Sequence, residues 1–418
     1  METAVSLHDL DHDQLATIVP ESLLSGQLID RSGMAHLIGA FGREGMTEVA
    51  IEEWMAASPI YTRRMRAALG IDGDGVEDMF KCLQLDIGAP PQFMDFRFSI
   101  VDRYHGSFVL DHCGALLDVE PMGDEYVTAM CHDIEDPTFD ATAIATNRRA
   151  RIRPVHRPPR TPVDRTPHCE WTVTIEPDRE ELPLPRVTEP MLVTQAADLA
   201  LSPIDPADSS GRGDYRGPLL EDLAFGEFSS SALRRIAEET ALQHQFLALG
   251  FLLSLLRRTS TEESDEILEK QLIGIAGITA ERLAAALFDG GRDAATLAAV
   301  LTVHPVFGPV QYTGVVAEVV GDHVRVRIPR DSAAVDDGAW LRLLAEGRLS
   351  ALQAAARAVD DTWVVGEGVV DGDDLVVTIR RGDPQPEAGE VAIVRFSAGS
   401  TFAFADRGPS KALPLTVL

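Results

Sequence analysis

Three of the four cysteines in this chain of 418 residues stand directly beside a histidine. The doublets are His112-Cys113, Cys131-His132 and His168-Cys169. Thiolates and imidazoles are ligands that zinc prefers, and a thiol close to an imidazole base can also act as a nucleophile. The doublets therefore mark residues 112–169 as the part of the chain in which chemistry is expected.

The direction of each side chain decides which of these groups can meet. Neighbours on a strand point to opposite faces, so each doublet on a strand sends one member inward. In the expected strand 107–113, His112 shares a face with apolar side chains, which turns Cys113 outward. Cys169 is in phase with the apolar face of its own strand, and Cys131 lies on the apolar face of a helix. The set predicted to converge is His112, Cys131 and Cys169.

One imidazole and two thiolates would suit zinc or iron, with a fourth position open for water. A carboxylate would then serve as base or proton shuttle, and several are close in sequence: Asp111, Glu120, Asp133, Glu135, Asp136 and Asp140. Without a metal, Cys131 would be the nucleophile and His112 its base, with His132, Asp133 and Asp136 completing the candidate catalytic set. No C-x-x-C or H-E-x-x-H spacing is present, and free cysteines are often buried as small apolar groups, so separate structural thiols are the alternative.

An insert rich in arginine and proline, around residues 148–165, follows this region. Arginine forks bind carboxylates and phosphates, and the prolines stiffen the segment, so Arg153, Arg157 and Arg160 are predicted to clamp a small anionic substrate. The alternative is a solvated loop that pairs with the protein's own carboxylates. Because no glycine-rich phosphate loop is present, no nucleotide cofactor is expected.

The elements that must position these residues occur twice. An offset of 218 residues lays 47–69 on 265–287 without gaps, and the same offset matches Arg64 with Arg282 and His105 with His323. This gapless pairing of each residue with the one 218 positions later is called the duplication alignment below. The tripeptide 173–175 matches 377–379 after a gap, because the second copy is shorter. The cysteines and the arginine insert have no counterpart in the second copy, so chemistry is expected in the first copy alone. The predicted organisation is a first copy over 1–176, a proline-rich acidic linker over 177–230 and a second copy over 231–418.

Each copy is predicted to be a helical layer packed on an antiparallel sheet, which gives an α+β fold with pseudo-two-fold symmetry. The expected helices of the first copy are 11–26, 31–43 and 47–69, before a hairpin over 94–113 and a strand over 169–176. The second copy is expected to have helices 231–257, 263–287 and 340–358 and a last strand over 390–396. The segment 238–257 is apolar almost all round, which predicts burial between the copies. His244 on it is interpreted as a satisfied interior histidine, with a ligand role as the alternative.

The composition restricts the class of protein. A net charge of −29 argues against nucleic acid and anionic membranes as partners, and no apolar run has the length of a membrane span. Unpaired cysteines without a signal sequence favour a cytoplasmic protein, and the excess of arginine over lysine is typical of GC-rich bacteria. A homo-oligomer is compatible with these features.

The second half of the first copy resembles two related groups of proteins. The segments that carry the resemblance are Cys113, then residues 130–133 (MCHD), then residues 169–173 (CEWTV). The groups are the L-2-amino-thiazoline-4-carboxylic acid hydrolase-like proteins and the small-molecule-binding domains of 4-vinyl reductase type. The resemblance covers about residues 95–176, and the zinc spacing of the second group (Cys, then Glu-x-x-Cys, then Cys) is not reproduced.

The two groups imply different functions. The first implies hydrolysis of a small C–N ring that carries a carboxylate, and the second implies binding of a small hydrophobic or aromatic ligand without chemistry. The leading hypothesis is a hydrolase of a small anionic amide or cyclic C–N compound. Ligand binding or sensing is the alternative, and a structural or partner subunit is a third hypothesis.

Overall fold

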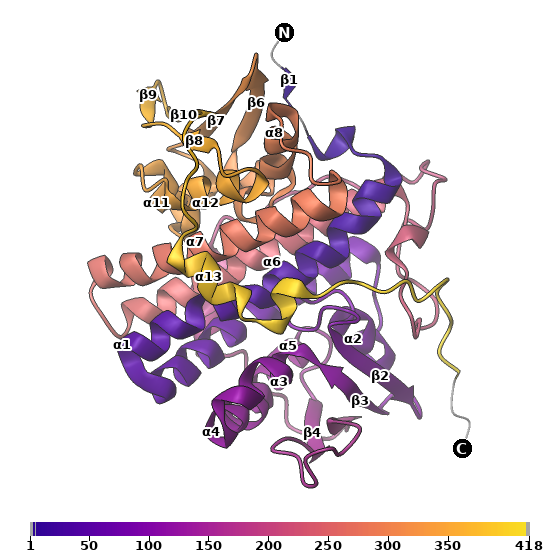
Figure 1. Ribbon diagram of the computed structural model, residues 1–418. Helices are drawn as coiled ribbons and strands as arrows, with labels where there is room; N and C mark the ends of the chain where they lie inside the picture. Colours follow the sequence, from indigo (N-terminus) through magenta and orange to yellow (C-terminus); the bar gives the residue numbers. More distant parts are fainter. Residues whose placement is uncertain (1–2, 5, 415–418) are drawn as a thin grey trace.

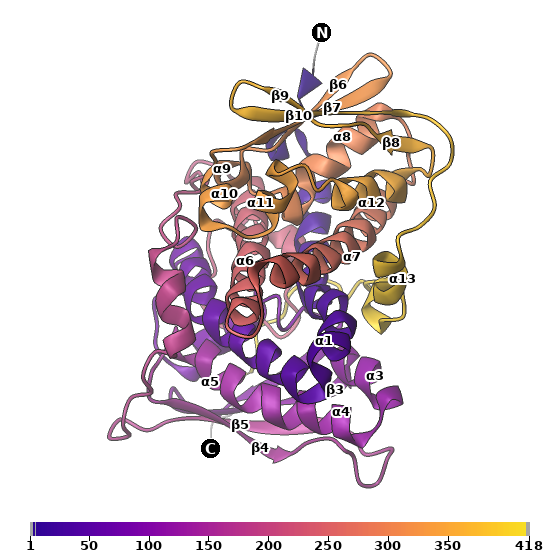
Figure 2. The same cartoon turned by 90° about the vertical axis from the view of Figure 1, so that its left-hand side faces the viewer.

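The computed structural model describes residues 3–4 and 6–414. A layer of long helices lies in the middle of the molecule, and one antiparallel sheet lies on each side of it (Figures 1 and 2). The predicted α+β class, a helical layer packed on antiparallel sheets, is confirmed.

Three long segments form the helical layer: α1 (His12–Leu69), α6 (Ser230–Leu256) and α7 (Thr261–Leu287). Within α1, Gly42 has a φ of 71°, which interrupts the helix and lets the chain reverse. The indole of Trp54 donates a hydrogen bond of 3.0 Å to Asp30, so the two arms lie antiparallel on either side of Gly42. The helix ends predicted near residues 26 and 31 are wrong, because the first arm runs without a break through that region.

The first sheet contains β2 (Met94–Ile100), β3 (His105–Cys113), β4 (Ala150–His156) and β5 (Cys169–Ile175), in the order β2-β3-β5-β4. Before it comes α2 (Val76–Leu83). The helices between β3 and β4 are α3 (Gly114–Val119), η2 (Glu120–Met122), α4 (Asp124–Thr128), η3 (Ala129–Ile134) and α5 (Glu135–Ile144). The start of the arginine insert, predicted as a loop, is the strand β4.

The second sheet contains β6 (Val316–Val320), β7 (His323–Pro329), β10 (Asp374–Arg381) and β8 (Trp363–Val365), in the order β6-β7-β10-β8. The order of the four strands is therefore the same in both sheets. Two short strands extend the second sheet, β9 (Val369–Asp371) on β10 and β1 (Thr3–Ala4) on β6. The helices of this half are α8 (Ala294–Val303), η6 (Pro305–Phe307), α9 (Val310–Thr313), α10 (Ala333–Asp337), α11 (Trp340–Ala345) and α12 (Ser350–Val359).

The contacts between the halves are reciprocal. Arg64 binds Glu239 and Arg282 binds Glu21, and the duplication alignment matches arginine with arginine and glutamate with glutamate. Each arginine also donates to backbone carbonyls of a segment that follows its own sheet, at residues 197–199 and 399–400. This exchange between matched residues is what a pseudo-two-fold pair requires, and it fits a duplication.

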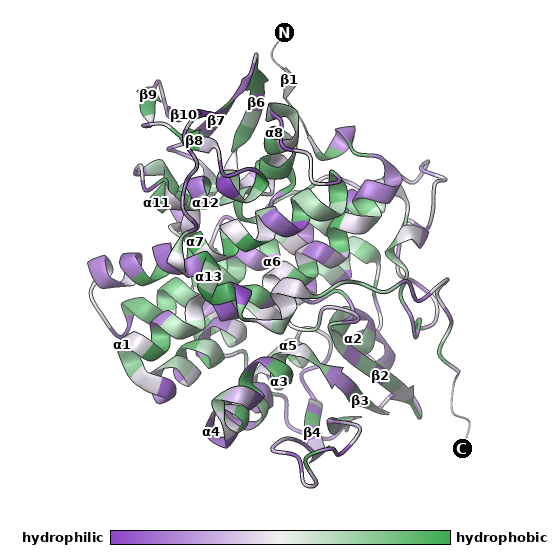
Figure 3. Cartoon of the chain, viewed as in Figure 1, coloured by the Kyte–Doolittle hydropathy of each residue, from purple (hydrophilic) through white to green (hydrophobic). Residues whose placement is uncertain are grey.

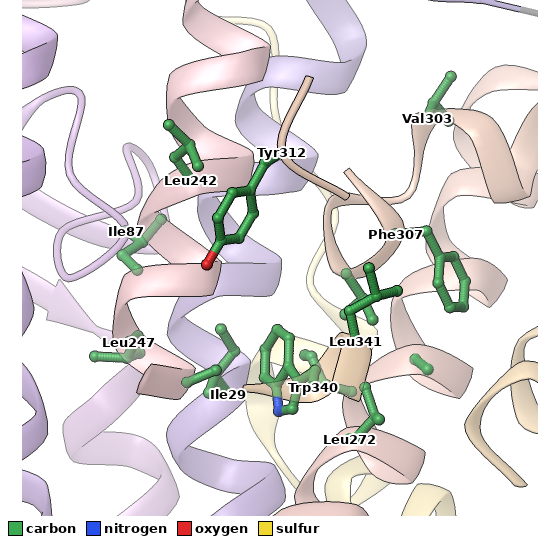
Figure 4. Close-up of a cluster of buried hydrophobic side chains, with 14 of the residues drawn as sticks. Ile29, Ile87, Leu242, Leu247, Leu272, Val303, Phe307, Tyr312, Trp340 and Leu341 are labelled. Carbon is green, nitrogen blue, oxygen red and sulfur yellow. The ribbon is translucent and has the colours of Figure 1, made fainter. Parts of the chain in front are cut away.

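The core is continuous across this seam. Figure 4 shows Ile29 of α1, Leu242 and Leu247 of α6 and Leu272 of α7 among the buried apolar side chains, and Figure 3 shows that apolar residues follow the same helices. The predicted burial of the segment 238–257 is confirmed over most of its length, which packs against both arms of α1.

Two further expectations about the second copy need correction. Residues 390–396 are not a strand; α13 (Gly389–Arg395) is a helix because Val391 and Val394 lie on one helical face, against Gly277 and Gly274 of α7. The predicted helix 340–358 is divided into α11 and α12. The tripeptide match of 173–175 with 377–379 is also out of register by two residues. Phe108 pairs with Trp171 in the first sheet, and its counterpart Val326 pairs with Val377 in the second. Val377 therefore corresponds to Trp171 and not to Val173.

The remaining 3-10 helices of the described residues are η1 (Leu7–Asp9) before α1, η4 (Arg186–Val193) and η5 (Phe225–Glu227) in the segment 177–230, and η7 (Ala398–Thr401) near the C-terminal end. η4 packs on α1 as α13 packs on α7. Among the described residues, no single helix combines the length and the apolar character of a membrane span; a bent pair, Ala294–Val303 with Pro305–Thr313, does so only when its two parts are taken together.

Candidate functional site

A β-bulge changes the expected directions of the first His-Cys doublet. Phe96 pairs with Leu110 and Met94 pairs with Cys113, so two residues of β3, Asp111 and His112, lie opposite one residue of β2. The extra residue reverses the alternation of the strand. Cys113 therefore points into the core with 5% of its surface exposed, Asp111 is exposed, and His112 is only partly buried. The prediction that Cys113 faces outward is wrong for this reason.

Three thiols and one carboxyl group occupy neighbouring positions in the first copy. Cys113, Cys131 and Cys169 belong to the same apolar cluster, and the predicted inward directions of Cys131 and Cys169 are confirmed. Burial and the nearby carboxyl group of Glu135 raise the pKa of all three thiols, that of Cys113 to about 12. Burial also raises the pKa of Glu135, to about 8.

Cys131 lies in a π-helical turn, η3, between α4 and α5. Such turns insert one residue into a helix and are frequent at functional sites. The turn buries Met130, Cys131 and Ile134 and places Glu135 at the start of α5. Glu135 thus lies between the thiols and a cavity on the other side of the turn.

The other predicted catalytic residues do not join the thiols. Asp133 is exposed, and the imidazole of His132 makes a hydrogen bond of 2.7 Å to the carbonyl of Pro158, which fixes the insert to η3. His112 lies close to His168, and burial, the charge of Arg160 and His112 together lower the pKa of His168. Within residues 3–4 and 6–414, no group of three or more His, Cys, Asp or Glu side chains has the geometry of a metal site. The set His112, Cys131 and Cys169 is therefore not assembled.

The arginines of the insert bind carboxylates of the protein itself. Arg153 makes two hydrogen bonds of 2.9 Å to Asp140, Arg160 binds Glu120 and Arg157 binds Asp136. The guanidinium of Arg157 also lies 5.6 Å from the ring centre of Trp171. These contacts match the alternative interpretation of the insert, in which it braces the helices between β3 and β4.

A cavity of about 70 Å³ lies between α1, the turn after α2, η3 and α5. Its polar lining comes from Gln27, Asp30, Tyr61, Asp86 and Glu135. The remaining wall is mostly apolar or aromatic and includes Trp54, Leu83, Ala89, Met94, Ala115, Met130, Ile134 and Phe139. The partly exposed residues of the lining are mainly those of α5, so the cavity opens along that helix.

Two carboxyl groups meet at the α1 side of this cavity. Asp30 accepts the indole hydrogen bond of Trp54, and its neighbour Glu53 is 2% exposed. Burial and the charge of Asp30 hold the pKa of Glu53 well above its usual range, which favours the protonated form of Glu53. One oxygen of each, Oδ1 of Asp30 and Oε2 of Glu53, has no hydrogen-bond partner.

Asp86 supplies a third carboxyl group, from the turn after α2. It is 4% exposed and accepts hydrogen bonds of 2.8 Å from the Tyr61 hydroxyl and 2.7 Å from the Gly88 amide. Burial raises the pKa of Asp86 to about 6 despite these bonds. In the described part of the chain, none of the carboxylates Asp30, Glu53, Asp86 and Glu135 forms an ion pair.

The duplication alignment shows that this acidic set belongs to the first copy only. The positions of Asp30, Glu53 and Asp86 are occupied in the second copy by neutral or weakly basic residues, Ala248, Gln271 and His304. His304 is fully buried and its pKa is lowered to about 3 by burial, so it is uncharged.

A glutamine is present in both copies, as Gln27 and Gln245. The amide of Gln245 donates to the carbonyls of Pro305, Val306 and Gly308. Gln27 is 5% exposed, lines the cavity, and its Oε1 has no partner. The same residue type is therefore hydrogen-bonded in the second copy, whereas its side-chain oxygen lacks a partner in the first copy.

A larger cavity, of about 230 Å³, lies in the other half, between the start of α1, α6 and the segment 302–316. Its lining is mostly apolar, and Glu238, its carboxylate, is already satisfied by Ser202 and Gln311. The smaller cavity is the stronger candidate because Gln27 Oε1 and Asp30 Oδ1 on its wall have no partner, and because Asp30 and Asp86 have no acidic counterpart in the second copy.

Sequence reasoning named Glu135 only as one of several acids and missed Gln27, Asp30, Glu53 and Asp86. The available signal was the comparison of the copies, since a buried helical position that is acidic in one copy and neutral in the other needs a reason. No family model, curated protein or solved structure matches this chain.

Proposed function

We propose that this protein binds a small molecule in the cavity of its first copy and that the second copy is a scaffold for it. The observation that carries the proposal is a difference between two matched residues. Gln27 lines a cavity and its buried Oε1 has no partner, whereas the amide of Gln245 donates to three backbone carbonyls. Buried polar groups without partners are costly, so unpaired acceptors on the wall of a cavity favour a ligand.

Cysteine-based hydrolysis has less support than binding. A nucleophilic cysteine needs a lowered pKa or an adjacent base, whereas the pKa of Cys131 is raised by burial and by Glu135. We therefore do not assign Cys131, His112 or a zinc or iron ion to a reaction.

Carboxyl chemistry is a second candidate, supported by one observation. Asp86 and Glu135 face the same cavity with pKa values raised to about 6 and about 8, which is the range that suits a general base and a general acid near neutral pH. A hydrolase that uses these two groups would bind its substrate in the same cavity, so the same experiments address both candidates.

The test is a fragment-binding experiment with a blocked cavity. Thr142 of α5 lines the cavity and is partly exposed, so Thr142→Leu should fill the opening without overpacking the core. Thr128→Leu on α4, also partly exposed but outside the lining, is the matched control. We expect fragments to bind the wild type and Thr128→Leu and to lose binding in Thr142→Leu. Equal binding by all three proteins would contradict the proposed site.

A further inference from the structure

We infer that the ligand of this cavity is a compact organic cation, a protonated amine with a short apolar group. This inference rests on the proposed function and adds the charge and size of the ligand. It differs from the anionic ligand expected from the arginine insert, whose arginines bind carboxylates of the protein.

The unsatisfied atoms of the cavity specify the polar part of the ligand. Gln27 Oε1 and Asp30 Oδ1 line the cavity and are acceptors without a partner, so the missing partner is a donor. An ammonium group has three N–H donors and a charge that would compensate buried carboxylates. A neutral donor such as an alcohol has one O–H and leaves the charge uncompensated.

The remaining wall specifies the rest of the ligand. Trp54 and Phe139 offer aromatic surfaces, and Met94, Met130 and Ala89 are apolar. Aromatic faces attract ammonium groups, and apolar side chains accept a short alkyl chain. A volume of about 70 Å³ limits the ligand to a few non-hydrogen atoms.

The charged groups around the cavity predict how binding depends on pH. Asp30 and Tyr61 face it from α1, with Glu53 behind them next to Asp30; Asp86 faces it from the turn after α2, and Glu135 from α5. The cation that acts on Glu135 is Arg157, itself paired with Asp136. A bound cation favours the ionised carboxylates, so affinity should rise as the pH rises through the pKa of Asp86, about 6, and of Glu135, about 8.

Three probes of equal shape test the charge: n-propylamine, 1-propanol and propionate. The indole N–H resonance of Trp54 is a local reporter because it donates to Asp30, and Trp171, Trp340 and Trp363 are internal controls. We expect n-propylamine to shift the Trp54 resonance saturably, with an affinity at least about tenfold above that of 1-propanol and propionate. Its affinity should increase between pH 5.5 and pH 8.5.

Variants make the test specific. Glu53→Gln carries the residue of the second copy and Asp86→Asn keeps the shape, so both should fold while n-propylamine affinity falls about tenfold or more. Asp111→Asn, an exposed acid on the bulge, should leave the affinity unchanged. Equal shifts of the Trp54 resonance by 1-propanol would contradict a cationic ligand but not the binding function. A saturable response to MgCl₂ or CaCl₂ alone would show that the site binds a metal ion instead of an amine. If no fragment of any charge bound, the proposed function would fail as well.

Discussion

Arg64 binds Glu239 through hydrogen bonds of 2.9 and 3.2 Å, and Arg282 returns the same contact to Glu21 at 2.7 and 3.1 Å. Both pairs are largely buried. One pair alone would be an ordinary interior ion pair. Two pairs related by the duplication alignment show how the halves are joined, with each copy giving an arginine and receiving one. The geometry thereby places the seam between α1 and the helices α6 and α7.

The two ion pairs should differ in strength. Glu239 also accepts from Arg235, four residues before it, so Glu239→Gln leaves two arginines without a carboxylate, whereas Glu21→Gln leaves one. Breaking a buried pair on one side typically costs about 3–5 kcal/mol. We expect both variants to lower the free energy of unfolding in urea, Glu239→Gln by more. Equal midpoints for the two variants and the wild type would show that the pairs do not hold the seam.

Stability should depend on pH through Glu135. Its pKa is raised from 4.5 to about 8 in the folded protein, so the folded state holds a proton that the unfolded state has lost between these values. The contribution of Glu135 to stability is therefore present below about pH 4.5 and is lost as the pH rises to about 8.

Glu135→Gln removes this dependence, so its stability relative to the wild type should rise from pH 5 to pH 8. We expect a relative gain of about 1–3 kcal/mol, reduced because Glu135 is partly exposed. His244 and His304 act in the opposite direction below about pH 6.5, because burial lowers their pKa values to about 4 and about 3. The difference between variant and wild type cancels that effect. An exposed control, Glu125→Gln, should give a constant difference at all pH values.

The thiols should be inert in the folded protein. A pKa of about 12 for Cys113 leaves about a thousandfold less thiolate than the usual value of 9.0. Cys82, Cys131 and Cys169 are also buried with raised pKa values. We expect 5,5′-dithiobis(2-nitrobenzoate) to label four thiols in denaturant and to react slowly with the native chain at pH 8. Rapid labelling of Cys131, or stoichiometric zinc released together with thiol reactivity, would restore the cysteine or metal hypothesis.

Most of the fold could be predicted because hydrophobic periodicity is a local property. The β2–β3 hairpin, β5 and helices α6 and α7 follow their patterns within a few residues. Residues 390–396 were misassigned because a short apolar segment fits both periods, and only contact with Gly274 and Gly277 selects the helix.

The site was harder to predict for two physical reasons. The bulge at Asp111 and His112 reverses the inward and outward alternation of side chains along β3, and no local sequence signal announces it. Cys113 therefore faces the core where His112 was expected. The carboxyl groups of the cavity come from α1 and from the turn after α2, far in sequence from the cysteines, and they meet only through tertiary packing. The cysteines and the arginine insert pointed to the first copy, whereas the acidic residues that distinguish its cavity lie in α1 and in the turn after α2.

The arginine insert should contribute to stability and not to binding. Arg160 binds Glu120 and is largely buried, so Arg160→Gln should lower the melting temperature. Arg153 is half exposed, and Arg153→Gln should cost less than about 1 kcal/mol. We expect n-propylamine affinity to be unchanged in both variants when the Trp54 resonance is titrated. A tenfold loss of affinity for propionate in either variant would support an anion clamp instead.

The seam also contains small residues that decide which copies can pair. A Cβ on Gly250 would lie 2.8 Å from the carbonyl oxygen of Glu53 and 3.3 Å from the Cβ of Ala56, and a Cβ on Gly274 would overlap the Ser32 hydroxyl. In the duplication alignment, Gly250 corresponds to Ser32 and Gly274 to Ala56. Each close contact thus pairs a glycine of the second copy with a larger residue of the first.

A fragment of residues 1–200 should therefore be unable to replace the second copy with another first copy. In a dimer of the fragment, Arg64 of one copy would bind Glu21 of the other in place of Glu239. Ser32 of one copy, however, would contact Ala56 of the other, and both residues carry a Cβ where the native contact has one glycine. We expect the fragment to aggregate, because its α1 face would be an exposed apolar patch. Ser32→Gly should relieve the contact and allow a soluble dimer, measurable by light scattering, and Glu21→Gln in the same fragment should weaken that dimer. A soluble wild-type fragment that binds n-propylamine as a monomer would show that the first copy folds without this seam.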